Sequence, residues 1–155
     1  MTSLGLRANN TEIYYAVLSL DEHSNYSIEA LSYLIIPVSL NFPEKLNFVR
    51  KTFKDIIFEY SIKRAGIRIT ETVARRINPQ RLSYEAILQE VLASSSIEKY
   101  MTGQISNISA RLGIPRENFK KIISGDVSHN IFNAKTNYSS EEKEAILAGI
   151  AALNL

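Results

Sequence analysis

The first forty residues alternate short apolar runs with polar turns, which is the pattern of half-buried β-strands. Residues 4–6 and 13–20 predict two strands around a polar turn at 7–11, because the second run is rich in aromatic and β-branched residues. After a second turn at 21–25, residues 32–38 predict a third strand. Short connections join neighbouring antiparallel strands, so this part of the chain predicts an antiparallel meander.

Helical periodicity follows the meander. Apolar residues recur at helical spacing from Pro43 to Tyr60, with Asn41 as a candidate cap, and this helix is expected to end near residues 64–66. The later elements are expected to be a strand at 67–70, a helix from Ser83 to about 94–96, a weak strand within 97–103, and helices at 104–112, 116–123 and 140–153.

Three antiparallel strands followed by alternating helix and strand fit few architectures, and the RNase H-like fold is the foremost of them. We therefore predict an α/β fold of this class, with a central mixed sheet (three antiparallel strands, then parallel strands) flanked by helices. The length suits one domain over residues 1–155.

Three segments resemble the RuvC-type Holliday junction resolvases of this superfamily. Residues 3–10 (SLGLRANN) resemble the first strand and turn of that family, and residues 67–71 (IRITE) resemble the strand that ends on a catalytic glutamate. Residues 141–148 (EEKEAILA) resemble the closing helix, which starts with two carboxylates three residues apart. The resemblance implies a metal-dependent endonuclease whose candidate catalytic and metal-binding residues are Glu71, Glu141 and Glu144.

The chemistry of such a nuclease explains the acidic positions. A two-metal site activates water with one ion and stabilises the leaving oxygen with the other. Mg²⁺ prefers oxygen ligands, so Mg²⁺ or Mn²⁺ is the cofactor expected of an active enzyme. Glu141 and Glu144 would share one face of their helix.

One departure from the family's pattern changes this picture. The first carboxylate should stand at position 7, where this chain has Arg7, and a guanidinium repels a cation. Arg7 could instead form ion pairs with Glu71, Glu141 and Glu144, which would leave a salt-bridged remnant of the metal site. In an active enzyme that uses Glu71, Glu141 and Glu144, Glu12 could replace the missing carboxylate.

Charge distribution adds a candidate nucleic-acid surface. The net charge is only +2, but residues 63–81 hold six basic residues and one acid. We take Arg68, Arg75, Arg76 and Arg81 as candidate nucleic-acid-binding residues. The alternative is an ordinary solvated surface.

Two further signals have structural alternatives. Glu141, Glu142 and Glu144 also suit a capped helix start, with Ser139 and Glu142 as a capping box. Residues 104–125 have the rhythm of a helix-turn-helix, but a helical pair that covers the sheet is the interpretation we favour.

Composition excludes several classes. The chain has no cysteine, which excludes disulfides and thiolate metal sites. We see no signal peptide and no membrane span, so a cytoplasmic protein is expected.

Three functional hypotheses remain open at this stage. The first is a nucleic-acid-associated RuvC-like domain, with DNA or RNA as partner, whose carboxylate site is degenerate and whose catalysis is lost or altered. The second is an active metal-dependent nuclease or resolvase. The third is a structural or interaction protein that forms a homodimer through its helices.

Overall fold

The computed structural model describes residues 1–132 and 136–155. Its strands are β1 (Thr2–Ala8), β2 (Glu12–Leu20), β3 (Tyr26–Ile35), β4 (Arg64–Arg68) and β5 (Lys99–Gly103). Its helices are α1 (Phe42–Glu59), α2 (Pro79–Ala93), α3 (Ile105–Leu112), α4 (Arg116–Ser124) and α5 (Ser140–Leu153). No helix in the described ranges combines the length and the apolar character that crossing a membrane requires.

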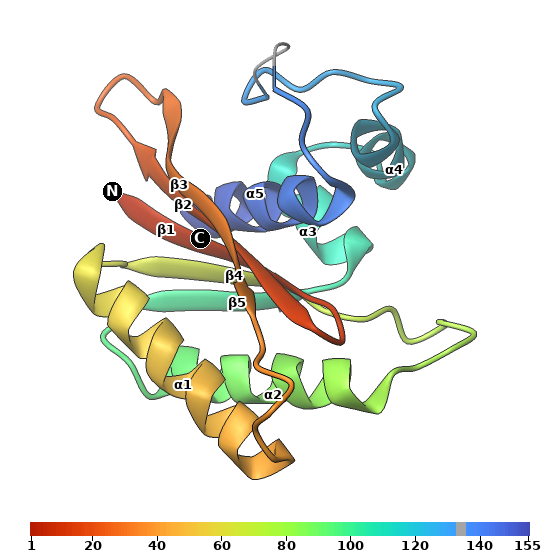
Figure 1. The fold of residues 1–155 in the computed structure, drawn as a ribbon. Helices are drawn as coiled ribbons and strands as arrows, with labels where there is room; N and C mark the ends of the chain where they lie inside the picture. Colours follow the sequence, from red (N-terminus) through yellow and green to blue (C-terminus); the bar gives the residue numbers. More distant parts are fainter. Residues whose placement is uncertain (133–135) are drawn as a thin grey trace.

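The strands form one mixed sheet in the order β3-β2-β1-β4-β5. β1 pairs antiparallel with β2, and β2 pairs antiparallel with β3. β4 pairs parallel with β1 on its other side, and β5 pairs parallel with β4. The predicted fold class is confirmed, because the three antiparallel strands and the two parallel ones occur in the predicted chain order (Figure 1).

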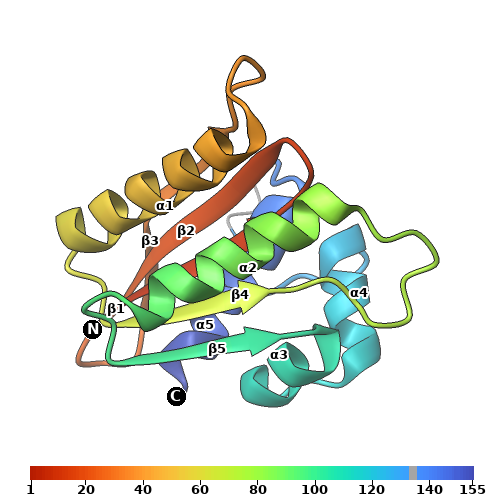
Figure 2. The same cartoon turned by 90° about the horizontal axis from the view of Figure 1, so that it is seen from below.

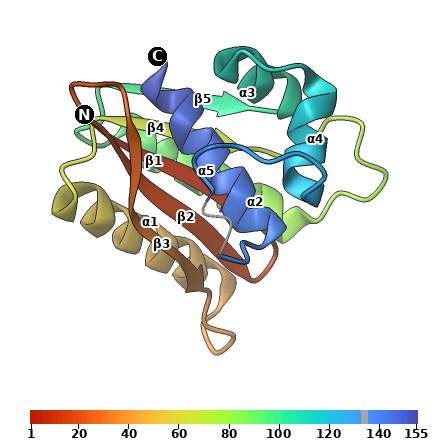
Figure 3. The same cartoon turned by 90° about the horizontal axis from the view of Figure 1, so that it is seen from above.

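Helices cover both faces of the sheet. α1 and α2 lie against one face (Figure 2), where Leu4, Leu6 and Phe53 belong to a fully buried apolar cluster. α5 crosses the other face, and α3 and α4 pack beside it at one end (Figure 3). Phe119 of α4 and Ile146 of α5 belong to a second cluster of buried apolar residues. α3 and α4 therefore form part of the helical layer that covers this face of the sheet. This is the interpretation that we favoured from the sequence over a helix-turn-helix.

α5 lies unusually close to β1. A methyl group added to Gly5 would collide with the backbone of Ala145 and with the amide of Gly149. Ser3, two residues earlier on the same face of β1, donates a hydrogen bond from Oγ to the Gly149 carbonyl at 2.9 Å. The small residues of both elements thus let backbone meet backbone, and this contact fixes where the start of α5 stands over the sheet.

Two predicted strand positions were wrong. The third strand runs from Tyr26 to Ile35 instead of 32–38, because a tight turn pairs Leu20 directly with Tyr26. Pro37 follows Ile36, and a proline has no amide hydrogen to donate to a ladder. The fourth strand covers Arg64–Arg68 instead of 67–70, because its register follows residues 3–7 of β1.

Two helix boundaries also differ from the prediction. α1 ends at Glu59 rather than near 64–66, because Ser61 takes a left-handed conformation (φ 49°) that leads into β4. α2 begins at Pro79 rather than Ser83. Asn78 caps it by accepting a hydrogen bond from the Arg81 amide at 3.0 Å.

Candidate functional site

Arg7 and Arg68 stand next to each other at the ends of two parallel strands. They are register partners on β1 and β4, and both strands end here, one residue beyond Arg7 and at Arg68. Side chains alternate along a strand, so Arg7 lies on the same face as Ser3 and Gly5, the face that α5 covers. The chain therefore places two guanidinium groups beneath the first turns of α5.

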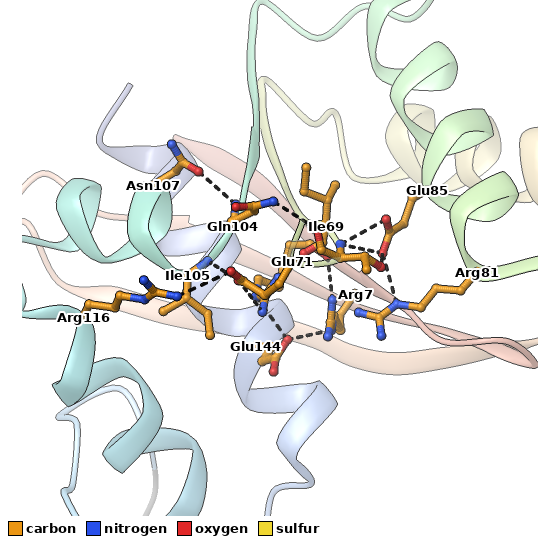
Figure 4. Close-up of polar contacts among 12 residues, drawn as sticks. Arg7, Ile69, Glu71, Arg81, Glu85, Gln104, Ile105, Asn107, Arg116 and Glu144 are labelled. Carbon is orange, nitrogen blue, oxygen red and sulfur yellow. Dashed lines mark hydrogen bonds and ion pairs between the residues drawn. The ribbon is translucent and has the colours of Figure 1, made fainter. Parts of the chain in front are cut away.

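Glu144 reaches this pair from above. Ser139 caps α5 by accepting the Glu142 amide at 3.1 Å, and Glu144 lies further along the same helix start. Its Oε2 is 2.6 Å from Arg7 Nε and 3.5 Å from Arg68 Nε (Figure 4). The side chains of Arg7 and Glu144 are 11% and 14% exposed, so this ion pair is largely shielded from water. One carboxylate is shared by two arginines.

Arg68 is more deeply buried than Arg7, and it contacts the loop that follows β4. Its side chain is 4% exposed, and its Nη2 is 2.9 Å from Glu71 Oε1. Its Nη1 donates to the Ile69 carbonyl, while its own carbonyl accepts from Arg7 Nη1 at 3.1 Å. A side chain so buried is not part of an exposed basic surface, which corrects the placing of Arg68 in the predicted basic patch.

Glu71 holds α3 and α4 against the end of β4. It lies three residues beyond the strand, and its Oε1 accepts the backbone amide of Ile105, the first residue of α3, at 2.9 Å. Its Oε2 is 3.6 Å from Arg116 Nη2 at the start of α4. A carboxylate at a helix N-terminus is favoured by the helix dipole. Both oxygens of Glu71 therefore have structural partners.

The sequence did not reveal one acidic member of the cluster, Glu85. This residue on α2 is 3% exposed, and its carboxylate accepts from both the amide and the hydroxyl of Thr70, at 3.0 and 2.8 Å. Arg81 Nε lies 3.1 Å from Glu85 Oε1. The available signal was an acid among the apolar positions of α2, four residues after an arginine.

Burial disfavours the charged state of the two central arginines. Desolvation lowers the pKa of Arg7 to about 10, with Glu144 opposing the shift and Arg68 and Arg81 adding to it. Desolvation also lowers the pKa of Arg68, against the attraction of Glu144 and Glu71. Arg7 therefore stays charged at neutral pH, and Glu144 is the main compensation for its charge.

This arrangement does not fit a metal ion. Arg7 Nε lies against Glu144 Oε2, and Arg68 and the Ile105 amide both contact Glu71 Oε1. Within residues 1–132 and 136–155, no three His, Asp or Glu side chains are grouped so that they could hold a metal. We therefore derive no step through Mg²⁺ or Mn²⁺.

The other predicted acids lie apart from the arginines. In the described residues Glu141 makes no hydrogen bond or ion pair. The pKa of Tyr14 is raised mainly by its hydrogen bond to Glu12, and the negative charge of Glu141 adds a smaller effect in the same direction. Glu12 accepts that hydrogen bond from Tyr14 at 2.7 Å. Among the described residues no three acidic or histidine side chains are placed to hold a metal ion together, so Glu71, Glu141 and Glu144 do not form such a set.

The basic residues of 63–81 divide into three groups. Lys63 pairs with Glu98 at the opposite end of β4 from Glu71. Arg81 is half-buried against Glu85. Arg75 and Arg76 are on the loop between β4 and α2, and neither forms an ion pair with any other described residue. These two remain the best-placed members of the predicted patch for contact with a phosphate backbone.

We expect Glu71→Ala to lower the free energy of unfolding by about 2 kcal/mol, because it leaves Arg68 and the Ile105 amide without their acceptor. Amide hydrogen exchange should quicken at the start of α3. The matched control is Glu141→Ala, which removes only a favourable dipole interaction and should cost under about 1 kcal/mol. Denaturant unfolding of both variants checks this, and equal losses would contradict a structural role for Glu71.

Comparison with known proteins identifies the fold. No protein-family model matches the chain, and no curated protein sequence is significantly similar to it. Among solved structures, Thermus thermophilus RuvC is similar with a TM-score of 0.74 at 7% identity, covering 99% of this chain and 94% of that one. The same protein in complex with a Holliday junction substrate gives 0.73 at 10% identity, with the same coverage.

A second resolvase supports the same result. The yeast mitochondrial Holliday junction resolvase is similar with a TM-score of 0.62 at 11% identity, covering 98% of this chain and 77% of that one. The chain therefore has the RNase H-like α/β fold that these resolvase structures share, at low sequence identity.

Proposed function

We propose that this chain is a DNA-binding domain that has lost the metal-dependent cleavage associated with its fold. The observation that carries the proposal is the contact between Arg7 Nε and Glu144 Oε2 at 2.6 Å. An arginine at this position supplies, within the protein, the positive charge that a metal ion would bring. Glu144 and Glu71 are then structural ion-pair partners rather than ligands.

DNA binding is supported by two observations. The fold is shared with RuvC and with a fowlpox virus resolvase (TM-score 0.52, 12% identity, 97% and 95% of the two chains), and both have been solved in complex with Holliday junction DNA. Arg75 and Arg76 lie on the loop that joins β4 to α2, and there they can neutralise backbone phosphates. Branched DNA is therefore the ligand that we propose.

The test is a binding and cleavage assay on one labelled four-way junction. We expect a retarded complex of equal affinity in EDTA and in Mn²⁺, with no shortened strands in either buffer. Junction cleavage that requires Mn²⁺ and disappears in Glu71→Gln would overturn the loss of catalysis. No junction binding in either buffer would overturn the proposed function as a whole and favour the interaction-protein hypothesis.

The double variant Arg75→Ala/Arg76→Ala should weaken junction binding and reduce the slope of log affinity against log salt by about 2, one unit for each phosphate that is no longer neutralised. The control is Lys51→Ala/Lys63→Ala, which removes the same charge from α1 and from the far end of β4. Fluorescence anisotropy at several salt concentrations measures the affinity and the slope for each double variant. Equal slopes for the two double variants would show that the loop does not contact the backbone.

Two further expectations are retained as proposals. We propose that the chain works in the cytoplasm, and that it forms a homodimer. Equilibrium sedimentation measures the second directly, and a monomer throughout the concentration range would rule the homodimer out.

A further inference from the structure

We propose that Arg7 and Arg81 together bind one phosphodiester group of the DNA backbone directly, with no metal ion between protein and phosphate. The inference deepens the proposed function and rests on it, since it names the contact that replaces the metal. It follows from three properties of the cluster: the position of the two guanidinium groups, their unused donors and the excess of positive charge.

The two guanidinium groups come from different elements and lie next to each other. Arg7 is on β1 and Arg81 is in the first turn of α2, and Figure 4 draws their side chains pointing toward each other near the end of the sheet. They are close enough that the charge of Arg81 lowers the pKa of Arg7, after desolvation and the charge of Arg68. Two neighbouring cations repel each other, so an anion between them would be favourable.

Each of the two arginines has an unused donor. Arg7 uses Nε for Glu144 and Nη1 for the Arg68 carbonyl. Its Nη2 makes no bond to any other described residue and is not among the fully buried unpaired atoms. Arg81 uses Nε for Glu85, and its Nη2 is buried without a partner among the described residues. Arg81 Nη1, like Arg7 Nη2, is unbonded within the described residues and is not fully buried.

The cluster holds more cations than anions. Four arginines (Arg7, Arg68, Arg81 and Arg116) are linked to three glutamates (Glu71, Glu85 and Glu144). Every one of these carboxylates already has at least two partners, so none is free to compensate the surplus. The surplus is the charge of Arg116, whose side chain is 54% exposed, so an anion can approach it from solvent.

A phosphodiester matches these requirements. It carries one negative charge, which equals the surplus, and its two non-bridging oxygens can each accept from a planar guanidinium. Arg75 and Arg76 lie on the loop that leads from the cluster to α2, where the adjoining phosphates of the same strand would meet them. The site would thus hold a backbone phosphate where a metal nuclease uses cations to do so.

A phosphate-interference scan tests the site. Four-way junctions would each carry one uncharged methylphosphonate linkage near the crossover, and binding would be measured in EDTA. For the unsubstituted protein, we expect one position at which the neutral linkage weakens binding by about tenfold or more, the effect of losing charge-assisted hydrogen bonds. Arg81→Gln should weaken binding of the unmodified junction by a similar factor, and the neutral linkage should then have little further effect.

Three controls make the outcome decisive. Arg75→Ala should keep the full penalty at that position, because it contacts a different phosphate. Arg81→Lys keeps the charge but loses the planar fork, so it should recover only part of the affinity, and thermal unfolding of both Arg81 variants verifies that they are folded. An interference penalty of equal size in Arg81→Gln and in the unsubstituted protein, or no sensitive position at all, would overturn the phosphate site while leaving DNA binding intact. Failure of the unsubstituted protein to bind any junction would overturn the proposed function itself.

Discussion

Arg7→Asp is expected to make the stability of this protein depend on a divalent cation. The substitution removes the main partner of Glu144 and puts a second carboxylate beside it, in a place where the side chains are only 11% and 14% exposed. Breaking a largely buried ion pair from one side costs about 3 kcal/mol or more. In metal-free buffer, the midpoint of thermal unfolding should therefore fall by roughly 6–12 °C.

Addition of Mn²⁺ or Mg²⁺ should restore part of this loss. The introduced aspartate would supply the carboxylate missing from the pattern, and with Glu144 it offers oxygen ligands to a hard cation. A cation that binds only the folded state raises the unfolding temperature with its concentration. Arg7→Asn is the matched control, because asparagine has the same size as aspartate but no charge. The account would be contradicted if Mn²⁺ raised the unfolding midpoint of Arg7→Asn as much as that of Arg7→Asp, or if it raised the midpoint of neither variant.

Gly5→Ala is expected to disrupt the packing of α5 on the sheet. The added methyl group would meet the backbone of Ala145 and Gly149, which cannot move aside as a flexible side chain can. We expect a loss of more than about 3 kcal/mol, at the upper end of overpacking effects. Because α5 carries Glu144, the same displacement should separate Glu144 from Arg7.

Gly103→Ala provides the comparison within the same sheet. A methyl group there would meet side-chain atoms of Ile108 and Met101 at 3.0 and 3.1 Å, and those side chains can shift. Gly103→Ala should therefore lower the free energy of unfolding by only about 1 kcal/mol. Denaturant unfolding, with amide hydrogen exchange of α5 as a second reading, distinguishes the two variants. Similar losses at both positions would contradict the close contact between β1 and α5.

Much of the fold was predictable because its signals are local. The β2 run of aromatic and branched residues, the capped start of α1 and the Ser139 capping box each act within a few residues. The start of β3 and the span of β4 were missed, since both depend on strand register. Register is set by pairing between strands, Leu20 with Tyr26 and Ser3 with Arg64.

The site was predictable only in part, for the same reason. The position of Arg7 opposite acids followed from the resemblance, but the sequence could not say which acids would meet it. Arg68 was assigned to a surface patch because sequence shows charge and not depth, whereas β4 carries it into the interior. Glu85 was missed because its partner Thr70 lies on a loop brought to α2 only by the fold.

The central claim is that Glu71 and Glu144 serve arginines instead of metal ions. Electron paramagnetic resonance of free Mn²⁺, recorded while the unsubstituted protein is titrated into millimolar metal, measures this directly. The account predicts that the signal of free Mn²⁺ stays unchanged, because both carboxylates are already paired. Uptake of Mn²⁺ in a fixed ratio to protein, abolished by Glu144→Gln, would contradict it.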